Sequence, residues 1–268
     1  TVLEADESTR YLVLEMGASG PGHIAYLTDI APLDAAGVLM IGHAHMGGFG
    51  SIEGVAAAKA EIIAGLRPEG IAILNADDAR AAAMAELAPA RVLTFSARGR
   101  QADLRAENVD LDAAARAAFD LHLPGLAEPR RVQLAVAGVH NVSNALAAAG
   151  LALAAGISPE LVADRLGSVS IESPHRMDIS ELSGDLLLID DSYNANIDSM
   201  TAALAVLPAL AGDRRRVVVI SEMLELGESS AADHARTGEL AARAGAAMLI
   251  GIGSTQEALE AARARGVE

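Results

Sequence analysis

The sequence predicts an α/β protein with a mostly parallel sheet and helices on both of its faces. Short β-rich runs alternate along the chain with stretches of helical period, the pattern of strand–helix–strand units. Hydrophobic residues make up 51% of the 268 residues, enough for a large core, whereas aromatic residues make up only 2%. The core is therefore expected to consist of Ala, Val, Leu and Ile.

The first part of the chain predicts buried strands that end near Gly, Asn or Ser. They are expected at residues 11–17, 35–42, 70–77 and 90–96, with helices at residues 51–66 and 77–88. Ligands collect at the carboxyl ends of strands in such sheets, so polar side chains at these ends are candidates for a site.

From residue 97 to residue 136 the pattern changes to alternating runs, which predict an antiparallel meander at one edge of the sheet. An alanine-rich helix is expected within 138–156, followed by a helix that begins near Pro159.

The strand–helix pattern restarts near residue 173, where we place a domain boundary between residues 1–172 and 173–268. Strands are expected at 185–191, 214–221 and 246–253, and helices at 198–210 and 230–244.

Composition excludes several classes of function. The formal net charge of −16 argues against nucleic acid or an anionic membrane as a partner. The chain has no cysteine, so disulfides, thiolate catalysis and cysteine-based zinc sites are excluded. The apolar stretches are too short for a membrane span and no signal peptide is visible, so a soluble, cytoplasmic protein is expected.

Individual polar residues are candidates for chemistry, each with a structural alternative. Glu15 ends an apolar run, where a metal ion or a cation would offset the cost of a buried carboxylate, but it could equally cap a loop. His45 lies in a glycine-rich loop that permits close approach of a ligand, although a lone loop histidine is more often a surface residue. Burial of Lys59 among small apolar residues would leave a neutral amine able to form a metal-binding carbamate with CO2; a snorkelling lysine is the alternative.

Two helix starts carry more hydrogen-bonding side chains than a cap requires. They are GVHNVSNALAAAGLALAAG at 138–156 and IDDSYNANIDS at 189–199. One or two such side chains serve a turn or a cap, so the surplus indicates contacts with a ligand.

Taken together, these stretches resemble the Mur ligases, ATP-dependent amide-forming enzymes that build the peptidoglycan peptide. The match covers nearly the whole chain, and the motifs that carry it are LEMGASGPGHIAYLTDIAP, AHMGGFGSIEGVAAAKAEI, LNADD, GVHNVSNALAAA, IDDSYNANIDSM and EMLELGESS. Their order is similar to that of the member that adds D-alanyl-D-alanine to UDP-N-acetylmuramoyl-tripeptide. The resemblance implies that residues 1–172 are most of a central ATP-binding domain and residues 173–268 the start of a Rossmann-like C-terminal domain, in a protein expected to be a monomer.

The resemblance also implies roles for particular residues. Glu15 and His45 match magnesium-site positions, and Lys59 matches the lysine whose carbamate helps to hold a second Mg2+. Arg176 matches the arginine that reaches the terminal phosphate of ATP, so the implied catalytic residues are His45, Lys59 and Arg176. The other positions that match nucleotide contacts are Asn75, His140, Asn141, Asp190, Tyr193 and Asn194.

The implied reaction forms an acyl phosphate from the tripeptide carboxylate and ATP, which the amine of D-alanyl-D-alanine then attacks. The chain departs from the family pattern because it contains no G-x-x-x-x-G-K-[ST] loop, which is expected upstream of Thr1. The fragment alone is therefore expected to be inactive. Smaller departures are Ile197 for a usual proline, Ser221 for glycine and Gly48 for an acidic residue.

Two alternatives stay open. One is a related Mur ligase or a folylpolyglutamate-type synthetase, and the other is a non-catalytic nucleotide-binding module that has lost its phosphate-binding loop.

Overall fold

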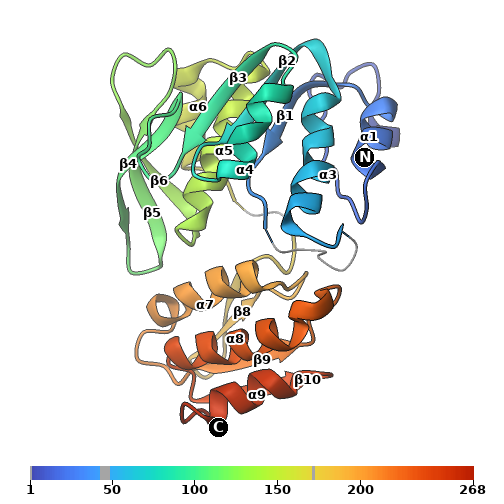
Figure 1. Ribbon diagram of the computed structural model, residues 1–268. Coiled ribbons are helices and arrows are strands. Elements are labelled where there is room, and N and C mark those ends of the chain that lie inside the picture. The colour runs from blue at the N-terminus through green and yellow to red at the C-terminus, as the bar shows by residue number, and fades with distance from the viewer. Residues whose placement is uncertain (1, 43–48, 171–172) are drawn as a thin grey trace.

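A computed structural model of the protein describes residues 2–42, 49–170 and 173–268 (Figure 1). Its main sheet has six strands in the order β1-β2-β3-β4-β5-β6. They are β1 (Leu33–Val38), β2 (Leu66–Asn75), β3 (Arg91–Ser96), β4 (Leu104–Leu111), β5 (Arg116–His122) and β6 (Arg130–Ala137). Strands β1 to β4 pair in parallel, whereas β5 pairs antiparallel with β4 and β6. The predicted parallel sheet with an antiparallel meander at one edge is confirmed.

Helices cover both faces of this sheet, as the alternation of side chains along β2 shows. Ile73 packs into a core shared with α5 (His140–Ala154) and α6 (Pro159–Leu166). The neighbouring Ala72 and Leu74 point the other way, into a core shared with α3 (Ile52–Ala64) and α4 (Ala79–Ala83). The other helical elements that the structure describes in this part are α1 (His23–Ile30), η1 (Val2–Glu4) and η2 (Met84–Leu87).

Small residues let the layers approach closely in a protein with so few aromatic side chains. Gly150 of α5 lies against β2, and a Cβ atom placed on it would be 2.8 Å from Cγ2 of Ile73. Ala147 and Ala149 of the same helix are buried. The alanine-rich composition of α5 therefore sets how closely the helix packs on the sheet.

The second part of the chain lies below this sheet in the view of Figure 1 and builds a core of its own. It contains an antiparallel pair, β7 (Asp178–Leu182) with β8 (Leu186–Asp190), and a parallel pair, β9 (Val217–Ser221) with β10 (Met248–Ile252). The helical elements are α7 (Ile197–Ala211), η3 (Gly227–Ser229), α8 (Ser230–Arg243) and α9 (Gln256–Arg263). Leu204 of α7, Ile220 of β9 and Leu249 of β10 are among the buried residues of this core.

Helices α8 and α9 touch at Gly238, which gives a first prediction. A Cβ atom on Gly238 would overlap the carbonyl oxygen of Ala258, a backbone atom that cannot rotate away. Gly238→Ala is therefore expected to lower the free energy of unfolding by about 1–3 kcal/mol, measured by urea denaturation. Gly17→Ala is the matched control, because a Cβ atom there meets nothing within 4 Å. Equal stabilities of the two variants would contradict this packing.

Helix α7 begins with Ile197 in place of the proline that is usual in the family pattern. The side chain of Asn196 accepts hydrogen bonds from the backbone N–H groups of Asp198 (3.0 Å) and Ser199 (2.9 Å). The hydroxyl of Ser199 in turn accepts from the N–H of Asn196 (3.0 Å), which completes a capping box. The helix therefore begins regularly at Ile197 without the proline. Ser221 ends β9, and Gly48 lies outside the described residues.

The strand expected at residues 11–17 is wrong. These residues belong to no strand, Leu14 and Met16 are half-buried and Glu15 is exposed. The apolar alternation was real, but a strand also requires a hydrogen-bonded neighbour, and no described strand pairs with this segment. Instead, residues 11–16 and β1 line the same cavity of about 1020 Å³.

Other differences concern the lengths and number of the elements. The helix expected over residues 77–88 is split into α4 and η2, and α1, β7 and α9 were not predicted. No helix within the described ranges is both long enough and apolar enough to cross a membrane.

Candidate nucleotide and metal site

Two loops next to the β7–β8 hairpin are held together by hydrogen bonds around Asp190. Nδ1 of His175 lies 2.7 Å from Oδ2 of Asp190. The backbone N–H and the hydroxyl of Ser192 donate to Oδ1 at 3.1 and 2.7 Å. The N–H of Met177 donates to Oδ1 of Asp191 at 3.0 Å, which adds a further contact between the loops. These contacts fix the loop around residue 175 against the end of β8.

The carboxyl group of Asp190 is a stable anion in this setting. The hydrogen bond from the Ser192 hydroxyl and then the contact with His175 lower the pKa of Asp190 to about 2. The group is therefore charged throughout the neutral pH range and accepts hydrogen bonds only.

Arg176 and Tyr193 form the exposed side of the same cluster. The guanidinium carbon of Arg176 lies 4.0 Å from the centroid of the Tyr193 ring, a cation–π contact. Both side chains are exposed, the tyrosine by 63%. The side chain of the next residue, Asn194, accepts from the N–H of Ala195 at 2.8 Å. A positive group and an aromatic ring thus lie side by side at an accessible surface.

The polar side chains at the start of α5 do not cap that helix. The N-cap residue, Val139, makes no side-chain cap bond. Nδ2 of Asn141 donates to the carbonyl of Ala137 at 2.7 Å, and its Oδ1 accepts from Asn144 at 2.9 Å. Because Asn141 ties the helix to the end of β6, its hydrogen bonds have a structural explanation, and its contact with a nucleotide stays a prediction.

His140 lies at the start of α5, and the carboxylate of Asp191 after β8 acts on it electrostatically. Its imidazole lies against Gly138, where a Cβ atom would come within 2.5 Å of the ring, and the φ of +105° at this position also favours glycine. Burial lowers the pKa of His140 below its usual 6.5, and the carboxylate of Asp191 opposes part of this shift. An expected nucleotide residue of the first part of the chain therefore lies within electrostatic range of the Asp190 loop.

This pKa shift predicts a pH dependence of stability. A histidine whose pKa is lowered on folding contributes stability above its ordinary pKa of 6.5, and this contribution is lost as the pH falls below that value. His140→Gln is expected to remove that part of the acid destabilisation in thermal melts between pH 8 and pH 5. In NMR titrations, Asp191→Asn should lower the pKa of His140 further. A pKa above 6.5 would contradict the assignment.

The LNADD motif connects the ends of β1 and β2. The buried Asn75 donates from Nδ2 to the carbonyl of Leu39 at 2.7 Å, and its Oδ1 accepts from the N–H of Asp77 at 2.8 Å. Asp78 caps α4 and accepts from the N–H of Ile41 at 2.7 Å. Both polar atoms of the Asn75 side chain are thus used within the fold, and its proposed approach to a nucleotide stays a prediction.

Lys59 lies on α3 with its amine directed at the loop after β1. Nζ donates to the carbonyl of Met40 at 3.2 Å. Burial lowers the pKa of the Lys59 amine, and the carboxylate of Asp78 opposes part of the shift. A half-buried side chain whose amine bonds to a backbone carbonyl is also the arrangement of a snorkelling lysine, so the role of Lys59 in a carbamate stays a prediction.

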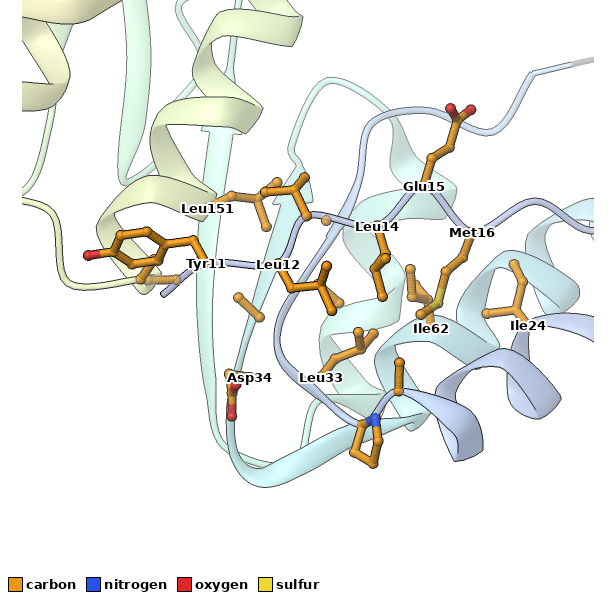
Figure 2. A pocket seen from close by; sticks show the side chains of 18 of the residues that line it. Tyr11, Leu12, Leu14, Glu15, Met16, Ile24, Leu33, Asp34, Ile62 and Leu151 are labelled. Carbon is orange, nitrogen blue, oxygen red and sulfur yellow. The ribbon is translucent and has the colours of Figure 1, made fainter. Parts of the chain in front are cut away.

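The expected metal ligands are only partly brought together. Glu15 and Lys59 line the same cavity, whereas His45 lies outside the described residues. Figure 2 shows Leu12 and Leu14 pointing towards the apolar side of the cavity and the Glu15 carboxylate pointing away from them. The described part of the chain contains no cluster of three His, Asp or Glu side chains that could hold a metal ion. The high cost expected for a buried Glu15 does not arise, because its side chain is exposed.

The sequence reasoning did not single out His175, and it gave Asp191 and Ser192 only as members of the polar stretch 189–199; all three organise the Asp190 cluster. The signals were the consecutive acidic residues that follow a strand and a histidine directly before Arg176.

Family comparison agrees with this α/β architecture. The model of the Mur ligase middle domain matches residues 1–152, and that of the Mur ligase glutamate ligase domain matches residues 175–267. The chain belongs to the Mur ligase family, as the sequence motifs predicted.

Several similar relatives carry the name of one type of enzyme within the family. The UDP-N-acetylmuramoyl-tripeptide–D-alanyl-D-alanine ligase of Mycobacterium tuberculosis is 44% identical over 258 residues, which cover 95% of this chain and 50% of the relative. A crystal structure of MurF from Acinetobacter baumannii matches with a TM-score of 0.87 and 35% identity, over 97% of this chain and 56% of that one. MurF ligase from Thermotoga maritima in complex with ADP matches with a TM-score of 0.76 and 26% identity, over 92% and 55% of the two chains. The chain thus spans about half the length of the curated relatives it matches.

Proposed function

We propose that this chain is part of an ATP-dependent ligase that joins D-alanyl-D-alanine to UDP-N-acetylmuramoyl-tripeptide in peptidoglycan synthesis. The observation that carries the proposal is the 44% identity over 95% of the chain to a ligase of that name. We further propose that residues 1–172 belong to the ATP-binding domain and residues 173–268 to the C-terminal domain. A hydrophobic core built only from residues of the second part supports this division, and a small cluster of Ala115, Ala137 and Val206 packs the two parts together.

The proposed reaction has two steps. A carboxylate oxygen of the tripeptide attacks the γ-phosphorus of ATP, and the bond to the bridging oxygen breaks so that ADP leaves. The amine of D-alanyl-D-alanine then attacks the acyl carbon, loses a proton and displaces inorganic phosphate, which leaves an amide. Negative charge develops first on phosphoryl oxygens and then on a tetrahedral oxyanion.

Three residues of the cluster described above have roles in this proposal. The exposed guanidinium of Arg176 stabilises charge on the transferred phosphoryl group. The Asp190 carboxylate accepts hydrogen bonds from ribose hydroxyls, which its ionised state supports. Tyr193, whose ring lies under the guanidinium, holds Arg176 in place. The remaining proposed nucleotide contacts are Asn75, His140, Asn141 and Asn194.

Magnesium is the metal that the proposed site would take. Glu15 offers carboxylate oxygens, and a carbamate on Lys59 would add the same kind of hard oxygen donor, with His45 as the third ligand. Bound Mg2+ would neutralise charge on the phosphate oxygens. Lys59 is suited to carbamate formation because burial lowers the pKa of its amine.

The choice of basic residues along the chain also supports a special role for Lys59. Of the 20 basic side chains counted as Lys or Arg, Lys59 is the single lysine and all the others are arginine. An arginine would serve equally well at a solvated surface position, but a guanidinium does not lose its proton and cannot form a carbamate. The single lysine side chain of the sequence thus lies at the position where the proposed carbamate requires an uncharged amine.

We also propose that a phosphate-binding loop of the full-length polypeptide comes from outside residues 1–268. The sequence contains no such loop. Strand β1 is an edge strand of the main sheet, and it shares an apolar-sided cavity with residues 11–16 (Figure 2). A cavity of about 1020 Å³ between an edge strand and an unpaired extended segment supports a further strand of the polypeptide at this edge.

The test is phosphate release by the purified full-length polypeptide. Release is expected to require ATP, UDP-N-acetylmuramoyl-tripeptide and D-alanyl-D-alanine together, and the 268-residue chain alone is expected to form no amide. Release that depends instead on glutamate or on a diamino acid would favour a related ligase. A protein that binds ADP but turns over no acceptor would favour the non-catalytic module.

A further inference from the structure

The backbone on both sides of Arg176 is in an unusual conformation. His175 has φ of +61° and Met177 has φ of +49°. Residues with a Cβ atom rarely adopt this left-handed region, and such backbone persists only when surrounding contacts hold it. Contacts around His175 must therefore hold its backbone in this conformation.

His175 makes one bond to the last residue of β8 and one to the loop that follows this strand. Its Nδ1 lies 2.7 Å from Oδ2 of Asp190, and because the carboxylate is ionised, Nδ1 is the donor. Its backbone carbonyl accepts from the N–H of Tyr193 at 3.1 Å. One residue thus contacts both the acidic group and the backbone of the tyrosine on which Arg176 lies.

These bonds complement those of Ser192. Ser192 donates only to Oδ1 of Asp190, which alone would leave the plane of the carboxylate free to turn. His175 holds Oδ2 and so fixes that plane. Ser192 occupies both acceptor positions of Oδ1, whereas His175 occupies one position of Oδ2, so Oδ2 retains capacity for a hydroxyl of a ligand.

We propose that His175 is a positioning residue of the nucleotide site. Its imidazole fixes the Asp190 carboxylate for ribose hydroxyls, and its left-handed backbone directs Arg176 onto the Tyr193 ring. The inference rests on the proposed function, which gives Asp190 and Arg176 their ligands.

Three substitutions of His175 separate the effect of its hydrogen bond to Asp190 from the effect of its left-handed backbone conformation. His175→Asn keeps a donor at nearly the position of Nδ1 and tolerates positive φ. His175→Gly keeps only the tolerance of positive φ, and His175→Ala keeps neither. Thermal melts establish that each variant of the full-length polypeptide is folded before its kinetics are compared.

The expected results differ between the variants. His175→Gly should raise KM for ATP about tenfold with little change in kcat, because one charge-assisted hydrogen bond is lost. His175→Ala should also lower kcat, because Arg176 is displaced, whereas His175→Asn should stay within about threefold of the wild type. Wild-type kinetics in the glycine and alanine variants, or an asparagine variant as impaired as alanine, would overturn the inference.

A second measurement does not depend on turnover. Carboxyl 13C NMR of the 268-residue chain should show the pKa of Asp190 rising in His175→Gly but not in His175→Asn. If the wild-type polypeptide forms no amide, the proposed function fails while this titration still tests the contact. An unchanged pKa in His175→Gly would show that the imidazole does not hold the carboxylate.

Discussion

Replacing Arg176 with alanine is expected to lower kcat for amide formation by about 10²–10³-fold in the full-length polypeptide, the usual loss when one group that stabilises transition-state charge is removed. The guanidinium is exposed and lies 4.0 Å from the Tyr193 ring, so it is held in place and is accessible to a phosphoryl group. The measurement is phosphate release at saturating substrates.

Matched variants separate charge from fold in this experiment. Arg165→Ala removes an exposed arginine of α6 and should leave kcat unchanged. Tyr193→Phe keeps a ring beneath Arg176 and should retain most activity, whereas Tyr193→Leu should lose part of it. An Arg176→Ala enzyme with more than about a tenth of wild-type kcat would remove Arg176 from the mechanism.

The second large effect is expected at Lys59. Lys59→Met should reduce amide formation by at least about 10²-fold, because neither the amine nor a carbamate remains. The same change should leave the melting temperature unchanged or raise it. Burial lowers the pKa of Lys59, so the folded state disfavours the protonated amine, and methionine removes this cost while filling the same space.

The carbamate itself is directly observable. With 13C-labelled bicarbonate, NMR should show a carbamate signal in the wild type that is absent in both Lys59→Met and Lys59→Arg. The assignment is simple because the sequence has no other lysine, which leaves only the terminal amine as an alternative source. Full activity of Lys59→Arg would mean that positive charge alone is needed at this position.

Local signals were sufficient for most of the fold. The alternation of strands with helices and the antiparallel meander follow from periodicity within short windows, and β3 to β6 lie where those windows placed them. The segment 11–17 has an equally clear alternation, but its pairing partner decides whether it becomes a strand. That partner is a tertiary feature, which periodicity does not contain.

The candidate site was less predictable. The same polar side chain at a strand end can form hydrogen bonds with the protein backbone or with a ligand, and the sequence does not distinguish the two. Asn75, for example, bonds to backbone groups at the ends of β1 and β2. The contact of His175 with Asp190 joins residues on either side of a hairpin through a left-handed backbone that no composition rule anticipates. The proximity of His140 to Asp191 likewise depends on how the two parts of the chain meet.

The ring beneath Arg176 also gives this molecule a built-in optical label. The sequence has no tryptophan and only three tyrosines, so near-ultraviolet absorbance and emission come from very few chromophores. One of them, Tyr193, is stacked under a cation, and any ligand that draws the guanidinium away alters the electronic surroundings of that phenol. Occupancy of the cluster is therefore readable in unlabelled protein by ordinary spectroscopy.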